Sequence, residues 1–289
     1  MKKYFLFAAA LFAALSLGFV SCENPDDNET SAAPDGVFSV SRSKYVVFSS
    51  GNLQYTQSTD TWSFAENQWD YIGTDNVTGG SVSSDPTCGD RKSGDALADK
   101  VDLFGWSTSI NNFGVSTSYD DDDYSGSFVD WGSNQIGSDA PNTWRTLTMD
   151  EWEYLLNTRP NASSLKGVAQ VNGVNGLILL PDSWSCPDGV TFKSGFFNYS
   201  GVNYVNYYAV YQTFTAAEWS KMEVAGAVFL PASGSHFCLL VSAVRYSGEY
   251  WSATGYDGGA HCLLFYSGAA DMYGYFRFDG RSVRLVKDL

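Results

Sequence analysis

The sequence predicts an α+β domain with two short helices, antiparallel strands and long loops, and three features indicate it. Short segments alternate apolar and polar residues, as half-buried strands do. Two Thr-x-x-Glu motifs mark helix starts, and two apolar runs end in Leu-Pro. Long stretches rich in Gly, Ser, Asp and Thr separate these elements. With 289 residues the chain can bury a large core, and we expect one domain over residues 36–289.

The N-terminal residues differ in composition from this domain. Lys2 and Lys3 precede an apolar run that is short for a membrane span, and Ser21 and Cys22 follow it. This order predicts a signal peptide over residues 1–21 and a lipid on Cys22. Plain secretion, with a chance cysteine at this place, is the alternative. Residues 22–35 are polar and acidic without apolar periodicity, so we expect a flexible linker.

The charge of the chain argues against two classes of partner. The net charge is −15, and removal of Lys2 and Lys3 with the signal segment leaves 15 basic residues against 32 acidic ones. Binding to nucleic acid needs a basic surface, and so does electrostatic docking onto anionic lipid. We therefore expect no nucleic-acid partner, and contact with a membrane through the lipid anchor only.

The first half of the domain reads as strands followed by loops. Residues 37–55 alternate around turn residues, which predicts a hairpin. An aromatic-rich edge continues with Trp62, Phe64, Trp69 and Tyr71. Residues 73–100 and 107–142 predict long loops, apart from a short apolar island at 128–131. The run Asp120 to Asp123 is consecutive rather than spaced as calcium ligands are, which favours a solvated bend over a metal site.

The second half repeats a helix followed by an apolar strand. Thr148 and Thr215 each begin a Thr-x-x-Glu capping box, in which the Thr oxygen and the Glu carboxylate bind the first free N–H groups of a helix. The strands that end in Leu-Pro are residues 176–181 and 227–231. We expect the helix glutamates to be structural rather than catalytic: Glu151, Glu153, Glu218 and Glu223.

Four cysteines follow Cys22, and their spacing is wide: Cys88, Cys186, Cys238 and Cys262. The absence of a CxxC pair argues against a zinc site, and we expect no bound metal and no cofactor. In an oxidising compartment one or two disulfides could form, but sequence does not give the pairing. Free buried thiols remain the alternative, above all for Cys238, which lies in an apolar run.

Five segments carry a resemblance to a known family: TMDEWEYLL, the two strands ending in Leu-Pro, GEYWSAT at 248–254 and GRSVRLV at 280–286. Together they resemble the C-type-lectin-like fold shared by formylglycine-generating enzymes and their non-catalytic relatives. The chain resembles in particular surface lipoproteins of gut Bacteroidota whose C-terminal segment is diversified by a retroelement. It departs from that pattern at Ala253, where Ser is usual, and at Arg281, where an apolar or aromatic residue is common.

The resemblance implies a variable segment at about residues 252–281 on a retained scaffold. Randomising the adenines of Asn codons never yields Lys, Glu, Gln or Trp, and residues 252–280 contain none of these four. The resemblance further implies that the ligand-binding positions are Gly259, His261, Cys262, Leu264, Tyr266, Asp271, Tyr273, Tyr275, Phe276, Phe278 and Asp279. It also likens the acidic stretch after Cys22 to the export tags of lipoproteins displayed on the outer surface.

The residues of this segment also favour a binding surface when they are considered without the resemblance. Leu263 and Phe265 alternate with Cys262, Leu264 and Tyr266, so we expect the first two to face the core and the other three to face outward. Exposed Tyr among Gly, Ser, Asp and Arg is typical of a binding surface. The alternative is a Tyr-rich sheet edge whose aromatic rings only pack against one another.

The two histidines do not indicate a catalytic site. His261 and Cys262 are neighbours in one strand and point to opposite faces, which does not suit mutual activation. His236 adjoins an apolar run and has no evident partner. Near the C-terminus, Val283 and Leu285 alternate with Ser282 and Arg284, which predicts a half-buried strand.

These observations predict a non-enzymatic lipoprotein of the outer membrane, exposed at the cell surface, that binds an extracellular protein or glycan through its variable face. Two alternatives remain open. A formylglycine-generating-type enzyme would need a deep pocket with convergent polar groups. A structural component of a surface fibre would expose a self-complementary patch.

Overall fold

The computed structural model describes residues 36–73, 81–82, 100–107, 127–197, 207–237 and 240–289. This part is rich in strands and has a few short helices, which confirms the α+β prediction. No helix within it is long and apolar enough to cross a membrane. Several predicted features lie outside the described residues: Cys22, the linker, Cys88, the run Asp120 to Asp123, Cys238 and most of the two long loops.

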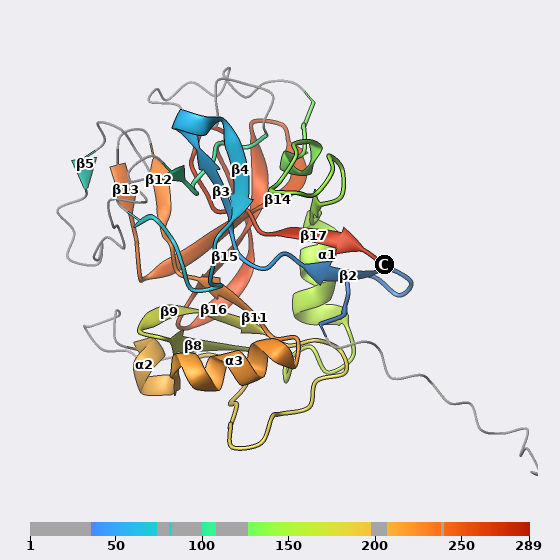
Figure 1. Ribbon diagram of the computed structural model, residues 1–289, viewed down its shortest axis with the longest axis vertical. Helices are drawn as coiled ribbons and strands as arrows, with labels where there is room; N and C mark the ends of the chain where they lie inside the picture. The colour runs from blue at the N-terminus through green and yellow to red at the C-terminus, as the bar shows by residue number, and fades with distance from the viewer. Residues whose placement is uncertain (1–35, 74–80, 83–99, 108–126, 198–206, 238–239) are drawn as a thin grey trace, which may run out of the picture. The chain divides into compact units, whose positions relative to one another are not determined.

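The strands of the described residues form five sheets (Figure 1). Two have four strands: β1 (Phe38–Ser39), β2 (Tyr45–Phe48), β17 (Leu285–Asp288) and β7 (Arg145–Thr146); and β10 (Thr213–Phe214), β8 (Lys166–Val171), β9 (Val174–Leu179) and β11 (Val228–Pro231). Three have three strands: β12 (Ser235–Phe237), β13 (Leu240–Ser242) and β5 (Ser81–Val82); β14 (Ser247–Tyr256), β15 (Gly259–Tyr266) and β16 (Ala269–Tyr275); and β4 (Thr61–Phe64), β3 (Leu53–Thr56) and β6 (Lys100–Val101).

The helical elements are short: η1 (Gln57–Thr59), η5 (Trp131–Ser133), α1 (Met149–Glu153), η6 (Tyr154–Thr158), α2 (Tyr207–Tyr211) and α3 (Ala216–Val224). Both predicted helices are present as α1 and α3, and both capping boxes are closed. The Thr148 hydroxyl accepts from the Glu151 N–H at 3.2 Å, and the Glu151 carboxylate accepts from the Thr148 N–H at 2.9 Å. Helix α2 was not predicted, because no Thr-x-x-Glu motif precedes it in the sequence.

The capping box of α3 supports a first prediction. The Thr215 hydroxyl accepts from the Glu218 N–H at 3.2 Å, and Thr215→Ala removes this acceptor. We expect Thr215→Ala to lower the free energy of unfolding by about 1 kcal/mol, the usual loss at such a position. Urea denaturation measures the change. Ser220→Ala, on the exposed side of the same helix, is the control and should show no loss.

The end of α1 continues into one π-helical stretch, η6, whose last carbonyls need partners from elsewhere. Two buried cations supply them. The Arg159 guanidinium donates to the Leu155 carbonyl at 2.8 Å, and the Lys166 ammonium donates to the Leu156 carbonyl. Burial and the nearby charge of Arg159 lower the pKa of Lys166. Basic groups at a helix C-terminus also interact favourably with the helix dipole.

The two strands that end in Leu-Pro are neighbours in one sheet. β9 pairs antiparallel with β11, and Gly176 lies opposite Pro231. A Cβ at Gly176 would lie 2.3 Å from the Phe229 ring, so only glycine allows this close packing. A two-residue turn, Asn172-Gly173, joins β8 to β9 with positive φ at both residues, as hairpin turns of this length favour.

Helix α3 lies along this sheet (Figure 1). The Trp219 ring packs against the Phe229 ring at 5.6 Å between centroids, and both side chains are fully buried. This packing explains why the second helix and strand of the repeat lie together. The sheet is not purely antiparallel, because β10 pairs with β8 in parallel.

The hairpin predicted over residues 37–55 is confirmed in part. β1 pairs antiparallel with β2, but β3 belongs to another sheet, where it pairs with β4 and β6. Local alternation cannot distinguish a strand that returns on its neighbour from one that pairs with a later segment. Trp62 and Phe64 do lie in an edge strand, β4, as the aromatic-rich edge predicted.

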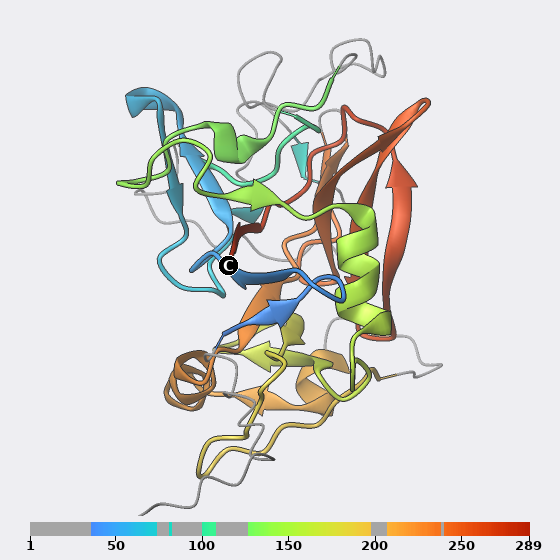
Figure 2. The same cartoon turned by 90° about the vertical axis from the view of Figure 1, so that its right-hand side faces the viewer.

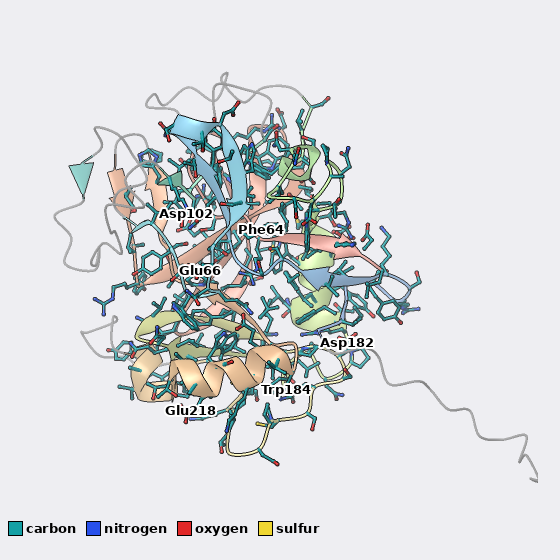
Figure 3. The ribbon with its side chains drawn as sticks, in the orientation of Figure 1. Phe64, Glu66, Asp102, Asp182, Trp184 and Glu218 are labelled. Carbon is teal, nitrogen blue, oxygen red and sulfur yellow. The ribbon has the colours of Figure 1, made fainter. Side chains whose placement is uncertain are left out.

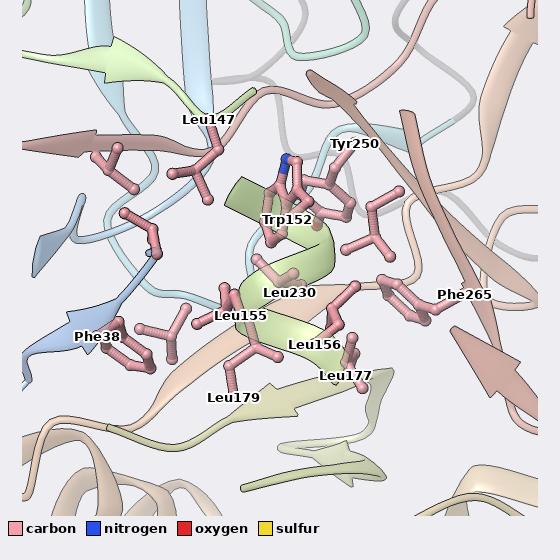
Figure 4. Packing of buried hydrophobic residues seen from close by; sticks show 14 of the residues in the cluster. Phe38, Leu147, Trp152, Leu155, Leu156, Leu177, Leu179, Leu230, Tyr250 and Phe265 are labelled. Atoms are coloured by element: carbon pink, nitrogen blue, oxygen red, sulfur yellow. The ribbon is translucent and has the colours of Figure 1, made fainter. Parts of the chain in front are cut away.

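The largest core cluster joins the N-terminal strands, α1 and the β14–β16 sheet (Figure 4). Trp152 of α1, Leu156 of η6 and Phe265 of β15 are fully buried there. Figure 2 shows α1 beside the β14–β16 sheet, in agreement with the contacts between these elements. One face of that sheet is therefore covered, and Leu263 and Phe265 point into the core as predicted.

The last strand differs from its prediction. Ser282 and Arg284 were expected to face outward, but they are 0% and 1% exposed. Other segments of the same chain cover both of these side chains. The Ser282 hydroxyl is hydrogen-bonded to the Ser233 hydroxyl at 2.7 Å, and the Arg284 guanidinium donates to the Gln68 side-chain oxygen at 2.7 Å. The half-buried prediction was wrong because alternation does not reveal a second covering layer.

Candidate ligand-binding face

The β14–β16 sheet brings most of the predicted binding residues to one side. Cys262 pairs with Tyr273, Leu264 with Asp271, and Ala260 with Tyr275. Directly opposed residues of paired strands point to the same side of a sheet, and alternate residues of one strand do so too. The side so defined, here called the Tyr-rich face, carries Cys262, Leu264, Tyr266, Asp271, Tyr273 and Tyr275.

The outer part of the Tyr-rich face is accessible. Tyr273 is 44% exposed, and Phe276, directly after β16, is 53% exposed. Asp271 is exposed as well, and Leu264 and Tyr275 are half-buried. The Tyr266 ring stacks on that of Tyr246, with 6.4 Å between centroids and 12° between planes. These contacts hold part of the aromatic surface in place and leave its outer faces to solvent.

Cys262 does not face outward, which corrects the prediction. Its alternation with Leu263 is as expected, but the thiol is 0% exposed because Trp251, Val283 and other buried residues cover that end of the face. Burial raises the pKa of the Cys262 thiol to about 12, so the thiol is protonated at neutral pH. A protonated, buried thiol is neither a nucleophile nor a ligand contact.

Gly259 and His261 do not lie on the Tyr-rich face. His261 pairs with Gly274 and alternates with Cys262, so the two side chains point to opposite faces, as expected. The His261 ring lies 4.9 Å from that of Tyr256. Gly259 is buried, and a Cβ there would lie 2.4 Å from the Tyr256 hydroxyl. The close approach of this ring explains the glycine.

Phe278 and Asp279, for which the resemblance implied ligand contact, are also buried, at 2% and 4% exposure. The Phe278 ring lies 5.9 Å from that of Phe237 and stacks on exposed Phe276 at 5.1 Å. The chain turns inward directly after Phe276. The resemblance gave these two positions, and strand alternation does not predict their burial, because it cannot be extended through such a turn.

A buried ionic cluster lies on the same side of the sheet as the Tyr-rich face, because Glu249 and Trp251 of β14 pair with Leu264 and Cys262. The Arg281 guanidinium forms ion pairs with Glu249 at 2.9 Å and Asp279 at 3.1 Å. It also lies over two rings, 3.9 Å from the centre of Tyr275 and 4.7 Å from that of Trp251. Arg281 is 2% exposed and thus connects β14, β16 and the C-terminal segment inside the protein. In the sequence, Arg281 stands out only as a departure from the pattern that the chain resembles.

The charges of this cluster affect one another. Burial opposes the charged form of Arg281, but Glu249, Cys262 and Asp279 together hold its pKa above the ordinary value. Burial raises the pKa of Asp279, although the Arg281 charge opposes this. Burial and the Glu249 charge raise the pKa of Tyr275 to about 12. An arginine at this position therefore stays charged throughout the physiological range.

A second arginine fastens the turn at the end of the sheet. The Arg277 guanidinium donates to the Gly259 carbonyl at 3.0 Å and to the Tyr256 carbonyl at 2.8 Å. It also lies 4.8 Å from the centre of the Trp106 ring. Arg277 thus holds the β14–β15 turn against the segment after β16, a role that composition alone does not suggest.

Other titratable groups lie apart from this face. The described residues contain no group of three or more His, Cys, Asp or Glu side chains placed to hold a metal ion. The exposed thiol of Cys186 and the buried thiol of Cys262 are free. His236 is 1% exposed, and neither of its ring nitrogens has a hydrogen-bond partner in the described part of the chain.

His236 supports a prediction about pH. Burial lowers its pKa from 6.5 to about 4, so the unfolded chain binds a proton that the folded chain does not. Stability is then complete above pH 6.5 and falls as the pH drops towards 4, by about 3 kcal/mol in all. His236→Leu should remove this part of the pH dependence. Urea denaturation of both proteins at pH 7.5 and pH 4 measures it, and equal losses would contradict the prediction.

No family model matches this sequence, and comparison with curated proteins and with solved structures found no similar chain. The candidate site therefore rests on the geometry of the chain's own residues.

Proposed function

We propose that this protein is a surface-displayed lipoprotein that binds an extracellular protein or glycan through the Tyr-rich face. The observation that carries the proposal is the gathering of exposed and half-exposed Leu264, Tyr266, Tyr273 and Tyr275 on one side of a sheet, with Phe276 beside them. Aromatic surface of this kind usually marks an interaction site, and Tyr offers large contact area at low entropic cost.

The construction of the sheet suits a face that changes while the fold stays constant. Backbone hydrogen bonds hold β14, β15 and β16 together, and they do not depend on the side chains. Leu263 and Phe265 anchor the opposite side in the core, and Arg281 anchors the C-terminal segment. Outward positions can then be substituted at little cost in stability. This is what a diversified C-type-lectin-like scaffold requires, and we propose that fold for the domain.

We propose fewer ligand-contact positions than the resemblance implies, and we choose them by their exposure to solvent. We assign ligand contact to the six accessible positions: Leu264, Tyr266, Asp271, Tyr273, Tyr275 and Phe276. We assign structural support to Gly259, Cys262, Phe278 and Asp279, because all four are buried. His261 is half-buried on the other side of the strand and falls outside the contact set.

Comparison of this gene among sibling strains tests the proposal. We expect substitutions to concentrate at the six contact positions and to spare neighbours of the same segment, with Leu263 and Phe265 as internal controls. A reverse transcriptase gene and a near-identical template repeat are expected beside it. Substitutions that are scattered over buried and exposed positions alike would refute a diversified binding face.

The proposed display on the cell surface depends on Cys22. We expect Cys22→Ser to prevent incorporation of labelled fatty acid and to release the protein from the membrane fraction. Protease added to intact cells should degrade the wild-type protein if it faces outward. Cys186→Ser, which removes an exposed thiol from the domain, is the control and should stay lipidated. Labelling that persists in Cys22→Ser would show that the anchor lies elsewhere.

A further inference from the structure

A hollow of about 260 Å³ lies where the β1–β2 turn meets the loops that follow η6 and β9. It shares no residue with the Tyr-rich face. Figure 3 shows Asp182, from the loop after β9, below β2. The residues that line the hollow include Ser39, Arg42, Tyr45, Tyr154, Asn161 and Asp182.

Asp182 is held in place from behind. One carboxylate oxygen accepts from the Arg159 guanidinium at 2.8 Å, and the other accepts from the Ser39 N–H at 2.9 Å. Arg159 is itself 2% exposed and lies over the Phe38 ring. Each carboxylate oxygen has a further lone pair, so Asp182 can still accept a hydrogen bond from a ligand hydroxyl. Such an acceptor needs no rearrangement on binding.

Ser39 lies in the wall of the hollow and fixes the carboxylate of Asp182. The residue is 5% exposed, and its side-chain hydroxyl is covered by the protein. Its part in the site is therefore the backbone N–H that it donates to Asp182, which leaves the carboxylate as the fixed acceptor for a ligand hydroxyl.

The charge and the aromatic rings indicate which ligand fits. Arg159 neutralises Asp182, and the exposed Arg42 adds a positive charge at the rim of a chain whose net charge is −15. A guanidinium binds carboxylates in a bidentate manner. Tyr45 is 44% exposed, and with Tyr154 it offers apolar ring surface next to the polar groups. The hollow combines a carboxylate receptor, hydroxyl acceptors and aromatic walls.

We propose that this hollow binds a single hexuronic acid unit. The carboxylate pairs with Arg42, ring hydroxyls donate to Asp182, and the apolar side of the sugar ring packs against Tyr45. Drug-sized ligands occupy about 300–1,000 Å³, so a hollow of this volume suits one sugar unit rather than an oligosaccharide. This site is independent of the proposed function of the Tyr-rich face.

Titration of the protein with sodium glucuronate, followed by NMR or calorimetry, tests the proposal. A small ligand in an open hollow should bind with a Kd on the order of 1 mM. Glucose, which differs by lacking the carboxylate, should bind at least tenfold more weakly. Methyl glucuronide reports whether a glycan-linked unit is accepted as well as the free sugar, and binding of either sugar acid supports the site.

Two variants assign the binding to this hollow. Arg42→Gln should weaken glucuronate binding at least tenfold, while Lys44→Gln, which removes an exposed cation two residues away, should leave it unchanged. Both positions are exposed, so the fold should not depend on them. Absence of saturation by glucuronate, equal binding of glucose, or equal effects of the two variants would overturn the proposal.

Discussion

Replacing Arg281 by Met should destabilise the domain by about 3–5 kcal/mol, the usual cost of removing one partner from a buried ion pair. The loss arises from what remains. Glu249 and Asp279 are 6% and 4% exposed, and without Arg281 they would face each other as buried carboxylates with no neutralising partner. The variant also removes the guanidinium that lies over Tyr275 and Trp251.

Urea denaturation at neutral pH measures this loss, with the slope of the transition checked for a change in the unfolded state. Arg145→Met is the matched control. Arg145 also binds two carboxylates, those of Glu151 and Asp288, but it is partly open to solvent, so its loss should be clearly smaller.

The triple variant Arg281→Met with Glu249→Gln and Asp279→Asn should recover part of the stability, because no unpaired charge is then buried. Equal losses for Arg281→Met and Arg145→Met would show that burial of the cluster is energetically unimportant.

The two sides of the β14–β16 sheet should respond very differently to truncation. Phe265→Ala should cost about 3–5 kcal/mol, because it leaves a cavity in the largest core cluster. Tyr273→Ala, on the neighbouring strand and the opposite side, should change stability by less than about 0.5 kcal/mol, as exposed substitutions do.

Thermal or urea unfolding of the two single variants and of the double variant checks this contrast. The losses should add, since the two side chains lie on opposite faces of the sheet. A large loss for Tyr273→Ala would mean that the Tyr-rich face is part of the structural core, which favours the alternative of an aromatic edge that only packs against itself.

Several features follow from short-range patterns, and those predictions are confirmed. The capping boxes at Thr148 and Thr215 need only four consecutive residues, so the sequence contains all the information for them. Alternation within one strand predicted that Leu263 and Phe265 face the core. The orientation of Tyr273 does not follow from its own strand alone; it follows from the strand with which it pairs. The opposed orientations of His261 and Cys262 follow from the same period of two.

Other features depend on segments that are far apart in the chain. Cys262, Ser282 and Arg284 alternate as outward residues do, yet a second layer of chain covers each of them. β9 pairs with β11, and β3 pairs with β4 and not with the hairpin before it. Both pairings likewise depend on interactions that a single segment does not specify. The alternation of residues within one strand does not show whether another segment of the chain packs over that strand.

The sequence by itself determined the α+β class, both capped helices and the side of β15 that faces the core, since helix caps and strand alternation are local. Only the tertiary structure decided which of the proposed binding positions reach solvent, and it placed Arg281 between Glu249, Asp279 and two aromatic rings. It alone also brought Ser39, Arg42 and Asp182 to one hollow. The physical reason is that burial and charge pairing depend on long-range packing, which a single chain segment does not specify.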